Sequence, residues 1–291
     1  MTGFINQFIN GLSLGAIYAL VAIGYSMVYG IIKLINFAHS DIVMAGAYIS
    51  FTCISVGMNP ILACVISMAV CTVLGISIEK ITYKPLRKCS TITLLIVSIA
   101  MSYILQSMFR LIYSSTPKTY PTIFNIPSIE ANGIYVSGIT VIIIVVSVIL
   151  MLLLTLLVTK TKSGKAMRAV SQDMGAAELT GINVNATISW TFALGSFLAA
   201  IAGILYASAY PVITPYMSAS FGTKAFASAV IGGIGSIPGA MLGGFLIGIL
   251  ESMSKAYLSS QLSKSVVFIL LIIVLLFRPS GILGKNQKEK V

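Results

Sequence analysis

The sequence predicts an all-α fold, a polytopic helical membrane protein with eight or nine transmembrane segments. The 291 residues are 57% hydrophobic and only 9% charged, whereas a soluble domain carries about 25% charged residues. Long stretches also contain no Asp, Glu, Lys, Arg or His, among them 1–30, 42–78 and 225–250. Because about 20 mostly apolar residues suffice for a helix to cross a bilayer, the whole chain, 1–291, is predicted to form one transmembrane domain.

The apolar stretches divide into nine segments, with turn residues or charges between them. The expected segments are Phe4–Ile32, Asp41–Val56, Ile61–Ile78, Thr91–Tyr113, Gly138–Val158, Ile188–Tyr210, Phe221–Ile234, Gly239–Ser254 and Val266–Phe277. Asn59 and Pro60 mark the turn before the third segment. The seventh is short, and whether it crosses or re-enters decides between eight and nine crossings. No basic residue precedes the first segment, which is therefore expected to be retained and not cleaved as a signal peptide.

Two connections are long enough to have structure of their own. Residues 114–137 carry three prolines and Gly133 and are expected to form a surface loop without a helical pattern. Residues 159–187 alternate basic, small and apolar residues and are expected to form short helices on the membrane face. The basic tail 285–291 is expected to be solvated.

Basic residues predict the orientation, because they gather on the cytoplasmic side of membrane proteins. Twelve of the eighteen lie in two loops and the tail: Lys80, Lys84, Arg87 and Lys88; Lys160, Lys162, Lys165 and Arg168; Arg278, Lys285, Lys288 and Lys290. Placing them in the cytoplasm puts the N-terminus outside and the C-terminus inside. Lys33 joins them if the first segment crosses once, which leaves Arg110, Lys118, Lys224, Lys255 and Lys264 outside. The net charge of +11 then reflects topology, and nucleic-acid binding is not expected.

Several kinds of chemistry lack their sequence patterns. There is no G-x-x-x-x-G-K-[ST] phosphate loop and no H-E-x-x-H, so neither an ATPase site nor a metal site is predicted in this chain. The glycine-rich run 232–239 has Pro238 where a dinucleotide fingerprint needs glycine, and is interpreted as a helix break. The four cysteines form no C-x-x-C pair, and three lie in apolar runs, so they are interpreted as small buried hydrophobes. With seven acids and one histidine, energy for transport is expected to enter from another subunit.

The first informative motif is the polar turn Asn36-Phe37-Ala38-His39-Ser40-Asp41. Ser40 and Asp41 suit the N-terminus of the second segment, where free N–H groups and the helix dipole favour them. The functional alternative is that this turn lies at the inner end of a transport pathway. Gly46, with small neighbours, would let the second segment pack closely against another helix.

The second motif is the inner loop 164–182. Its Ala176-Ala177-x-x-x-Gly181 fits the A-A-x-x-x-G core of the coupling loop found in ABC importer permeases, and Gly181 suits a helix C-terminus. The alternative is an ordinary amphipathic interfacial helix. The residues assigned to this loop are Met167, Arg168, Gln172, Asp173, Ala176, Ala177, Glu178 and Gly181.

The C-terminal third carries glycines four residues apart, a spacing that lets membrane helices approach closely. The predicted helix-packing residues are Gly235, Gly239, Gly243, Gly244 and Gly248. Glu251 and Lys255 are interpreted as an i, i+4 pair near a helix end, in preference to a buried coupling acid.

Together these segments resemble the branched-chain amino acid ABC transporter permease family. The resemblance covers nearly the whole chain and is carried by G-A-I-Y-A-L-V-A-I-G at 15–24, I-N-F-A-H at 35–39, G-A-Y at 46–48, M-R-A at 167–169, L-T-G-I at 179–182, F-L-A-A-I-A-G at 197–203 and I-G-G-I-G-S-I-P-G-A at 231–240. One departure is Gly175, which stands where many ABC permeases carry Glu in the coupling motif.

The resemblance implies a permease subunit, not an enzyme, in a bacterial cytoplasmic (inner) membrane. It implies alternating access, with ATP and Mg on two cytoplasmic ATP-binding partner subunits and no cofactor on this chain. It also implies a second, related permease in a heterodimer, an extracytoplasmic solute-binding protein that delivers leucine, isoleucine or valine, and two halves of inverted topology. The broken segments 36–50 and 221–236 are expected to line the pathway, with Asn36, Phe37, His39, Asp41, Gly46, Phe226, Ser228, Gly232 and Gly233 as its residues.

Three alternatives stay open at this point. The same architecture could import urea or another small polar solute. The chain could instead be a stand-alone channel or an ion-coupled carrier, which would transport without ATPases. A purely structural membrane protein is disfavoured by the polar, glycine-broken segments. The scarcity of charge in the apolar segments suits a pathway that holds a zwitterion loosely.

Overall fold

A computed structural model describes residues 2–87, 89–124, 126–131 and 133–284. The basic tail predicted at 285–291 lies outside the described residues. The described chain is mostly helical, with four two- or three-residue strands.

Six helices are long and apolar enough to cross a membrane. They are α1 (Thr2–Ile32), α3 (Pro60–Ile78) with its continuation through η1 (Glu79–Tyr83) and α4 (Lys84–Leu86), α5 (Thr91–Tyr113), α6 (Gly138–Lys160), α9 (Val184–Ala209) and α11 (Ile237–Tyr257). A shorter apolar helix, α12 (Leu262–Phe277), follows. The predicted class, a helical multi-pass membrane protein, is confirmed.

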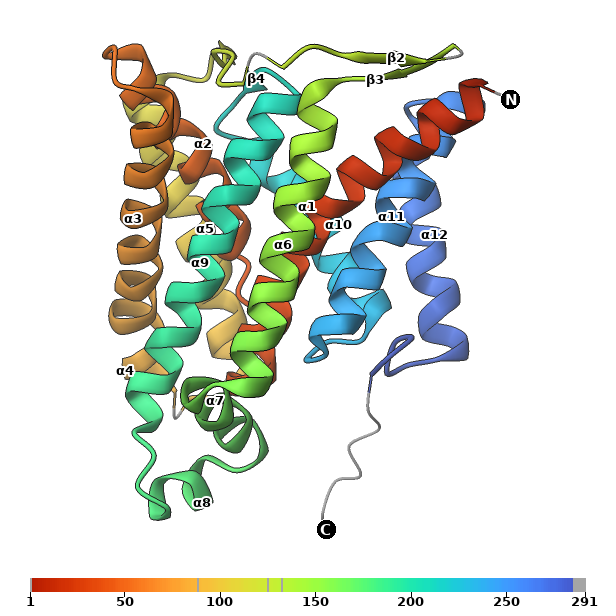
Figure 1. Cartoon of the computed structure of the whole chain (residues 1–291). Helices are drawn as coiled ribbons and strands as arrows, with labels where there is room; N and C mark the ends of the chain where they lie inside the picture. The colour runs from red at the N-terminus through yellow and green to blue at the C-terminus, as the bar shows by residue number, and fades with distance from the viewer. Residues whose placement is uncertain (1, 88, 125, 132, 285–291) are drawn as a thin grey trace.

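The predicted second and seventh segments correspond to shorter helices, α2 (His39–Ser55) and α10 (Met217–Gly232). Their 17 and 16 residues give lengths of about 25 Å, less than the roughly 30 Å hydrocarbon core of a bilayer. The His39 side chain at the start of α2 lies against Gly24 and Gly195, which are deep inside α1 and α9. α2 therefore begins in the middle of the helical bundle, and residues 33–38 lead the chain back there from the end of α1 (Figure 1).

Helix α1 forms the centre of the bundle and packs against α11, α9, α10 and α6. Residues 13–28 of α1 are all buried. α1 approaches α11 most closely, and glycines of α11 permit this contact. A Cβ added to Gly248 would lie 2.2 Å from the Gly15 Cα, and one added to Gly244 would lie 2.4 Å from the Ala19 Cα. α1 and α11 thus meet backbone to backbone along their length.

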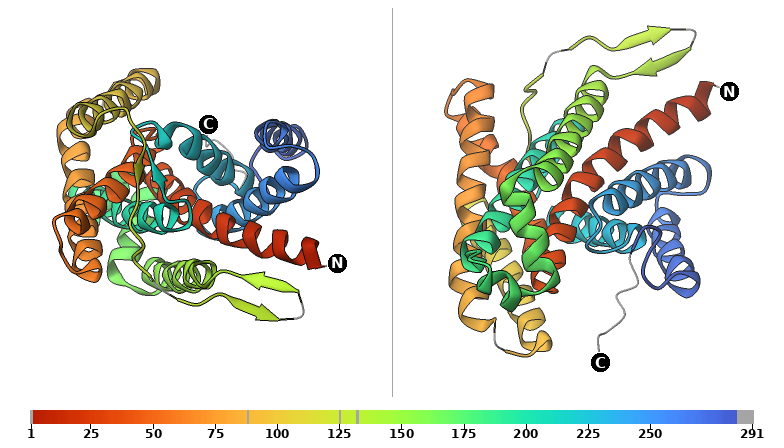
Figure 2. Two further views of the ribbon diagram at one scale, coloured as in Figure 1. Left: turned by 90° about the horizontal axis from the view of Figure 1, so that it is seen from above. Right: turned by 60° about the horizontal axis from the view of Figure 1, so that its bottom comes forward.

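The two ends of the bundle differ (Figures 1 and 2). At one end β1 (Lys118–Thr119) pairs antiparallel with β4 (Val212–Ile213), and β2 (Ile129–Ala131) pairs with β3 (Ile134–Val136). The described part of the predicted loop 114–137 has no helix, as expected. At the other end lie α4, α7 (Lys162–Gln172) and α8 (Met174–Leu179). Of these, α7 and α8 are the short helices expected within 159–187. We call the two ends the hairpin end and the short-helix end.

The cysteines are all unpaired, and the interpretation of them as buried hydrophobes is only partly right. Cys71 is buried, Cys53 and Cys64 are half-buried, and Cys89 is exposed at the short-helix end. Apolar surroundings in the sequence do not distinguish the protein core from the lipid-facing surface.

Candidate functional site

The start of α2 carries the polar motif 36–41, and its side chains contact neighbouring helices instead of capping α2. The N-cap residue is Ala38, with no side-chain cap. The Ser40 hydroxyl donates to the Phe37 carbonyl at 3.0 Å, and Asp41 Oδ1 accepts a 3.0 Å hydrogen bond from Gln106 Nε2 on α5. Ser40 and Asp41 lie in the first turn of α2, as predicted, but neither side chain caps the free N–H groups, because this helix end is buried among α1, α5, α9 and α10.

His39 and Asn36 face different sides of this buried turn. The His39 ring packs edge-on against Tyr25, with 4.9 Å between ring centroids, in the space left by Gly24 and Gly195. Asn36 Oδ1 accepts a 2.8 Å hydrogen bond from the Tyr83 hydroxyl on η1. The motif thus joins α1, α9 and η1 to the first turn of α2.

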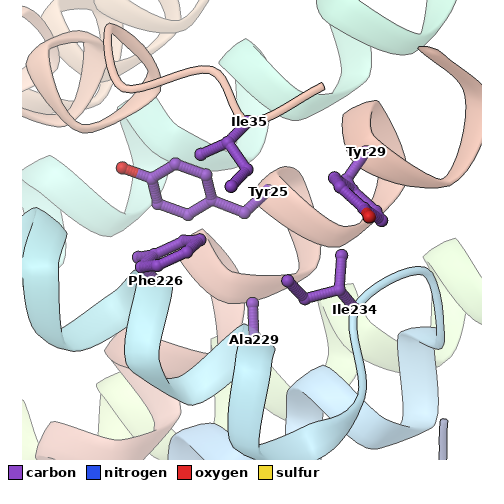
Figure 3. Close-up of a pocket in the computed structure, with 6 residues that line it drawn as sticks. All are labelled: Tyr25, Tyr29, Ile35, Phe226, Ala229 and Ile234. Atoms are coloured by element: carbon purple, nitrogen blue, oxygen red, sulfur yellow. The ribbon is translucent and has the colours of Figure 1, made fainter. Parts of the chain in front are cut away.

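Phe37 and Phe226 bring the motif against α10. Their ring centroids lie 5.9 Å apart, and Phe226 lies 6.0 Å from Tyr25. Beside these rings is a small cavity of about 10 Å³ (Figure 3), roughly the space that one water needs. It is lined by Tyr25, Tyr29, Ile35, Phe226, Ala229 and Ile234.

Four of the eight buried side-chain polar atoms that make no hydrogen bond within the described residues lie around the same turn. They are Asn36 Nδ2, His39 Nε2, Asp41 Oδ2 and the Ser218 hydroxyl of α10. Most buried polar atoms in proteins are hydrogen-bonded, and polar residues inside membranes are costly and mark functional sites. This cluster is the strongest candidate for a site that a polar solute visits.

The other predicted pathway residues lie elsewhere on α2 and α10. Gly46 is two turns along α2, where an added Cβ would lie 2.7 Å from the Ala200 Cα. Ser228, Gly232 and Gly233 lie toward the far end of α10, and an added Cβ on Gly232 would lie 1.9 Å from the Gly239 carbonyl oxygen. These four are positions of close helix packing and are not brought into the polar cluster.

The predicted packing glycines form two rows on α11 and its approach. Gly239 and Gly243 face α10, at Gly232 and Ser228, while Gly244 and Gly248 face α1. Gly235 has a φ of +90° and lies beside Gly30 of α1. Each of the five is placed where a larger side chain would meet a neighbouring backbone or require strain.

Two residues of the cluster were missed by the sequence reasoning, Ser102 and Gln106 on α5. Gln106 Nε2 contacts both Asp41 Oδ1 and Ser102 Oγ, the latter at 3.1 Å. The signal was a polar residue every fourth position, from Ser98 to Arg110, in an otherwise apolar segment. That spacing places the polar residues on one face of a helix.

The short-helix end presents a second surface, made by α7 and α8. Met167 and Ala177 are buried, whereas Arg168, Gln172, Asp173, Ala176 and Glu178 are exposed. Asp173 caps α8 by accepting from the Ala176 N–H at 3.0 Å. Leu179 at the tip of α8 is 91% exposed.

Gly181 ends α8 as predicted. Its φ is +82°, and the N–H groups of Gly181 and Ile182 bond to the carbonyls of Glu178 and Ala177. This is the Schellman arrangement of a helix C-terminus. α8 is therefore a rigid, capped turn whose outer face is free in this chain.

Comparison with known proteins places this architecture in a family. Residues 7–276 match the sequence model of the branched-chain amino acid transport system / permease component family. The chain belongs to this family. It is 43% identical over 99% of its length to the high-affinity branched-chain amino acid transport system permease protein BraD of Pseudomonas aeruginosa, of which 98% is covered. It is 41% identical, with the same coverage, to the corresponding LivH of Escherichia coli K12.

Among solved structures, the permease is similar to PsaBC from Streptococcus pneumoniae in complex with Fab, with a TM-score of 0.49 and 12% identity over 96% of this chain and 91% of that one. A likeness at this level supports no conclusion about fold or function. The family match itself shows a transport permease component and not an enzyme, in agreement with the prediction.

The permease contains a buried ion cluster that corrects two sequence-based expectations. Glu251 of α11 is fully buried, and its Oε1 lies 2.6 Å from both Lys224 Nζ of α10 and Lys255 Nζ. Its Oε2 accepts a 2.8 Å hydrogen bond from Tyr18 of α1. The pair Glu251–Lys255 exists as predicted, but the acid is also buried against Lys224. Lys224 lies inside the bundle and not at the outer surface, so the apolar segments do hold strong charges.

A second buried ion pair joins η1 and α4 to the start of α9. Arg87 contacts the buried Glu79 carboxylate and donates to Asn185 Oδ1 at 2.7 Å. The Ser189 hydroxyl donates to Glu79 Oε2 at 2.6 Å. α9 directly follows α8 in the chain. The network therefore lies between α8 and Tyr83, whose hydroxyl donates to Asn36.

Proposed function

We propose that this chain is the membrane-spanning permease subunit of an ATP-driven importer of leucine, isoleucine and valine. The observation that carries this proposal is the 43% identity to BraD over nearly the full length of both chains. The sequence has no phosphate loop of its own, which supports ATP hydrolysis on partner subunits. The chain would lie in a bacterial inner membrane, with its N-terminus outside and its C-terminus inside.

The solute path would pass the polar turn 36–41 and the facing part of α10. Two features support this position: the unpartnered polar atoms of Asn36, Asp41 and Ser218, and the beginning of α2 within the bundle. Broken helices in transporters place backbone and polar groups at the membrane midplane, where solutes bind. A cysteine scan of 36–50 and 221–236 tests the path, because aqueous thiol reagents would label pathway positions and leave a fully packed segment inert.

An inverted pair of half-repeats would organise this path. The order long helix, non-helical segment, short helix, long helix occurs as α1, 33–38, α2, α3 and again as α9, 210–216, α10, α11. The packing is also reciprocal, because α1 contacts α10 and α11 while α9 contacts α2 and α3. α2 runs from the middle of the bundle toward the hairpin end, whereas α10 runs toward the short-helix end (Figure 1).

The short helix α8 would dock on an ATPase, and the route from there to the polar turn would run through η1. Asn185 and Ser189 in the first turns of α9 contact the Arg87–Glu79 ion pair. Tyr83, on the same π-helix as Glu79, then donates a hydrogen bond to Asn36. η1 is a π-helix, a rare element that is frequent at functional sites. In alternating access, ATP-driven movement of α8 would reach the first turn of α2 by this route.

The partners follow from the same proposal. A second, related permease would complete the membrane unit as a heterodimer, two ATP-binding subunits holding ATP and Mg would bind at the short-helix end, and a solute-binding protein would dock at the hairpin end. The exposed Leu179, Ala176 and Glu178 would supply the contact with an ATPase.

The experiment is the ATPase activity of the complete complex in liposomes, with the binding protein and candidate solutes. Stimulation by leucine, isoleucine or valine supports the proposal, whereas stimulation by urea alone would keep the architecture and change the substrate. Leu179→Ser is expected to reduce stimulation at least severalfold, because it removes the exposed apolar contact. Leu258→Ser is the matched control. Leu258 is also an exposed leucine, with an exposed fraction of 63%, but it follows the C-terminus of α11, at the opposite end of the bundle from α8. Ala177 is a poor probe because it is buried.

A further inference from the structure

A row of polar side chains runs along one face of α5. Ser98, Ser102, Gln106 and Arg110 are spaced by four residues in a helix that is otherwise mostly apolar, so they span about 18 Å of one face. Ser98 is fully buried, Ser102 and Gln106 are half-buried, and Arg110 is exposed near the hairpin end. The row therefore leads from the exterior into the bundle.

The two outer residues of this row contact the candidate pathway. Gln106 Nε2 lies 3.0 Å from Asp41 Oδ1 of α2. Arg110 Nη1 donates to the Tyr216 hydroxyl, just before α10, at 3.3 Å. This hydrogen bond lowers the pKa of Tyr216. The outer half of the row thus lies beside α2 and Tyr216.

Opposite charges lie on either side of Gln106, with Asp41 on α2 and Arg110 one turn further along α5. Asp41 is fully buried, accepts a hydrogen bond from the neutral Gln106 amide, has the Ser102 and Ser218 hydroxyls beside it, and pairs with no cation among the described residues. Arg110 donates to a neutral phenol. A buried carboxylate without a cationic partner is costly, and an arginine matches a carboxylate with two parallel hydrogen bonds.

We propose that this row binds the charged backbone of an α-amino acid, with Arg110 taking the α-carboxylate and Asp41 Oδ2 the α-ammonium group. The proposal rests on the proposed function and assigns the groups that recognise its substrate class. Gln106 lies between the two charges and can hydrogen-bond either group of the solute. The long Arg110 side chain can turn inward from Tyr216, which brings both charges toward one small zwitterion.

An aromatic cluster beside the row suits an apolar solute side chain. The ring of Tyr48 lies 5.6 Å from Phe109 and 4.6 Å from Tyr113 by centroid distance. Such rings offer large apolar area at low entropic cost. The combination of two opposite charges and an apolar wall matches leucine better than urea or a sugar, neither of which carries a charge.

The test uses the complete permease–ATPase complex in nanodiscs without the binding protein, so that solute selection by that protein does not interfere. Photo-leucine is cross-linked by light and competed with leucine, with leucinol, which lacks the carboxylate, and with 4-methylpentanoate, which lacks the ammonium group. We expect labelling on α5, α2 or α10, and competition by leucine at least about tenfold stronger than by either analogue, as befits the loss of a charged hydrogen bond.

Variants of Arg110 and Asp41 test which charged group of the solute each residue binds. Arg110→Gln is expected to weaken competition by leucine about tenfold and to leave competition by leucinol unchanged. Arg110→Lys keeps a positive charge and is expected to weaken competition by leucine less. Asp41→Asn is expected to weaken competition by leucine and to leave competition by 4-methylpentanoate unchanged. Lys118→Gln, a nearby cation in β1 and outside the row, is the control and should change nothing. Since Arg110 is exposed, its variants are expected to fold.

Two results would overturn the assignment. The first is unchanged competition by leucine in Arg110→Gln. The second is labelling confined to the region of Glu251. If the complex nevertheless imports leucine with ATP in either case, the proposed function stands and only this site is wrong. Import of another solute and never of leucine would instead refute the proposed function.

Discussion

At the scale of single residues, Gly248 decides how closely α1 and α11 can approach. A Cβ added there would lie 2.2 Å from Gly15 backbone atoms, so Gly248→Ala must separate the two helices. Overpacking of this kind typically costs about 1–3 kcal/mol. We expect a clear fall in the melting temperature of the purified complex.

Gly3→Ala is the control for this substitution, because no atom lies within 4 Å of an added Cβ at Gly3. It should leave the melting temperature unchanged or slightly raised, since alanine favours helix. Equal melting temperatures for the two variants would contradict backbone contact between α1 and α11.

Glu251 provides the second prediction at this scale. Glu251→Gln would leave Lys224, only 8% exposed, without its counter-charge, and breaking a buried pair in this way costs about 3–5 kcal/mol. Lys255→Gln should cost less than about 1 kcal/mol, because the Lys255 side chain is 41% exposed. Thermal unfolding of the two variants measures the difference.

A double-mutant cycle separates the pair from its surroundings. Replacing Lys224 by Gln in the Glu251→Gln background should recover part of the loss, because it removes the isolated buried charge. A double variant whose loss is the sum of the single losses would show that the pair is not coupled.

At the scale of elements, the sequence was sufficient to predict the bounds of the long helices, but it did not predict where the short helices lie within the bundle. The predicted Thr91–Tyr113 coincides with α5, and Gly138–Val158 falls two residues short of α6. The second and seventh segments were placed correctly along the chain, but apolar length does not report the depth at which a helix begins. The start of α2 depends on Gly24 and Gly195 making room for His39, which is a tertiary effect.

The candidate site shows the same limit. The motif 36–41 was found because it is polar between apolar segments, yet its partners Gln106 and Tyr83 lie 65 and 47 residues away. Likewise the count of basic residues assigned Lys224 to the outer side of the membrane, whereas its partner Glu251 lies 27 residues away on another helix. Local spacing predicts neighbours on one helix, and only packing reveals those on another.

The connection through η1 gives the prediction at this scale. Tyr83→Phe removes the hydrogen bond to Asn36 while keeping the ring that packs 5.5 Å from Phe192. We expect the ATPase rate to persist while leucine imported per ATP falls about threefold to tenfold, as the loss of one buried hydrogen bond would give. Both quantities are measured in the same liposomes.

Tyr135→Phe is the matched control, since it removes a hydrogen bond to Ser128 in the β2–β3 hairpin. It should leave the ratio of import to hydrolysis unchanged. An unchanged ratio in Tyr83→Phe as well would remove η1 from the coupling route.

At the scale of the whole molecule, orientation is open to a direct test. The exposed Cys89 belongs to the short-helix end and Leu258 to the opposite end of the bundle. With the three other cysteines replaced by serine, a membrane-impermeant maleimide should label Leu258→Cys in intact cells and leave Cys89 unlabelled until the cells are opened. The reverse pattern would place the N-terminus in the cytoplasm and contradict the positive-inside assignment.

Import through this permease is predicted to require partner ATPases. The most direct measurement is accumulation of labelled leucine in liposomes that contain the complete complex and binding protein, with and without ATP, beside liposomes that contain this chain alone. We predict accumulation against a gradient only in the complete complex with ATP. Equilibration of leucine through this chain alone, without ATPases, would contradict the importer and indicate a channel or carrier.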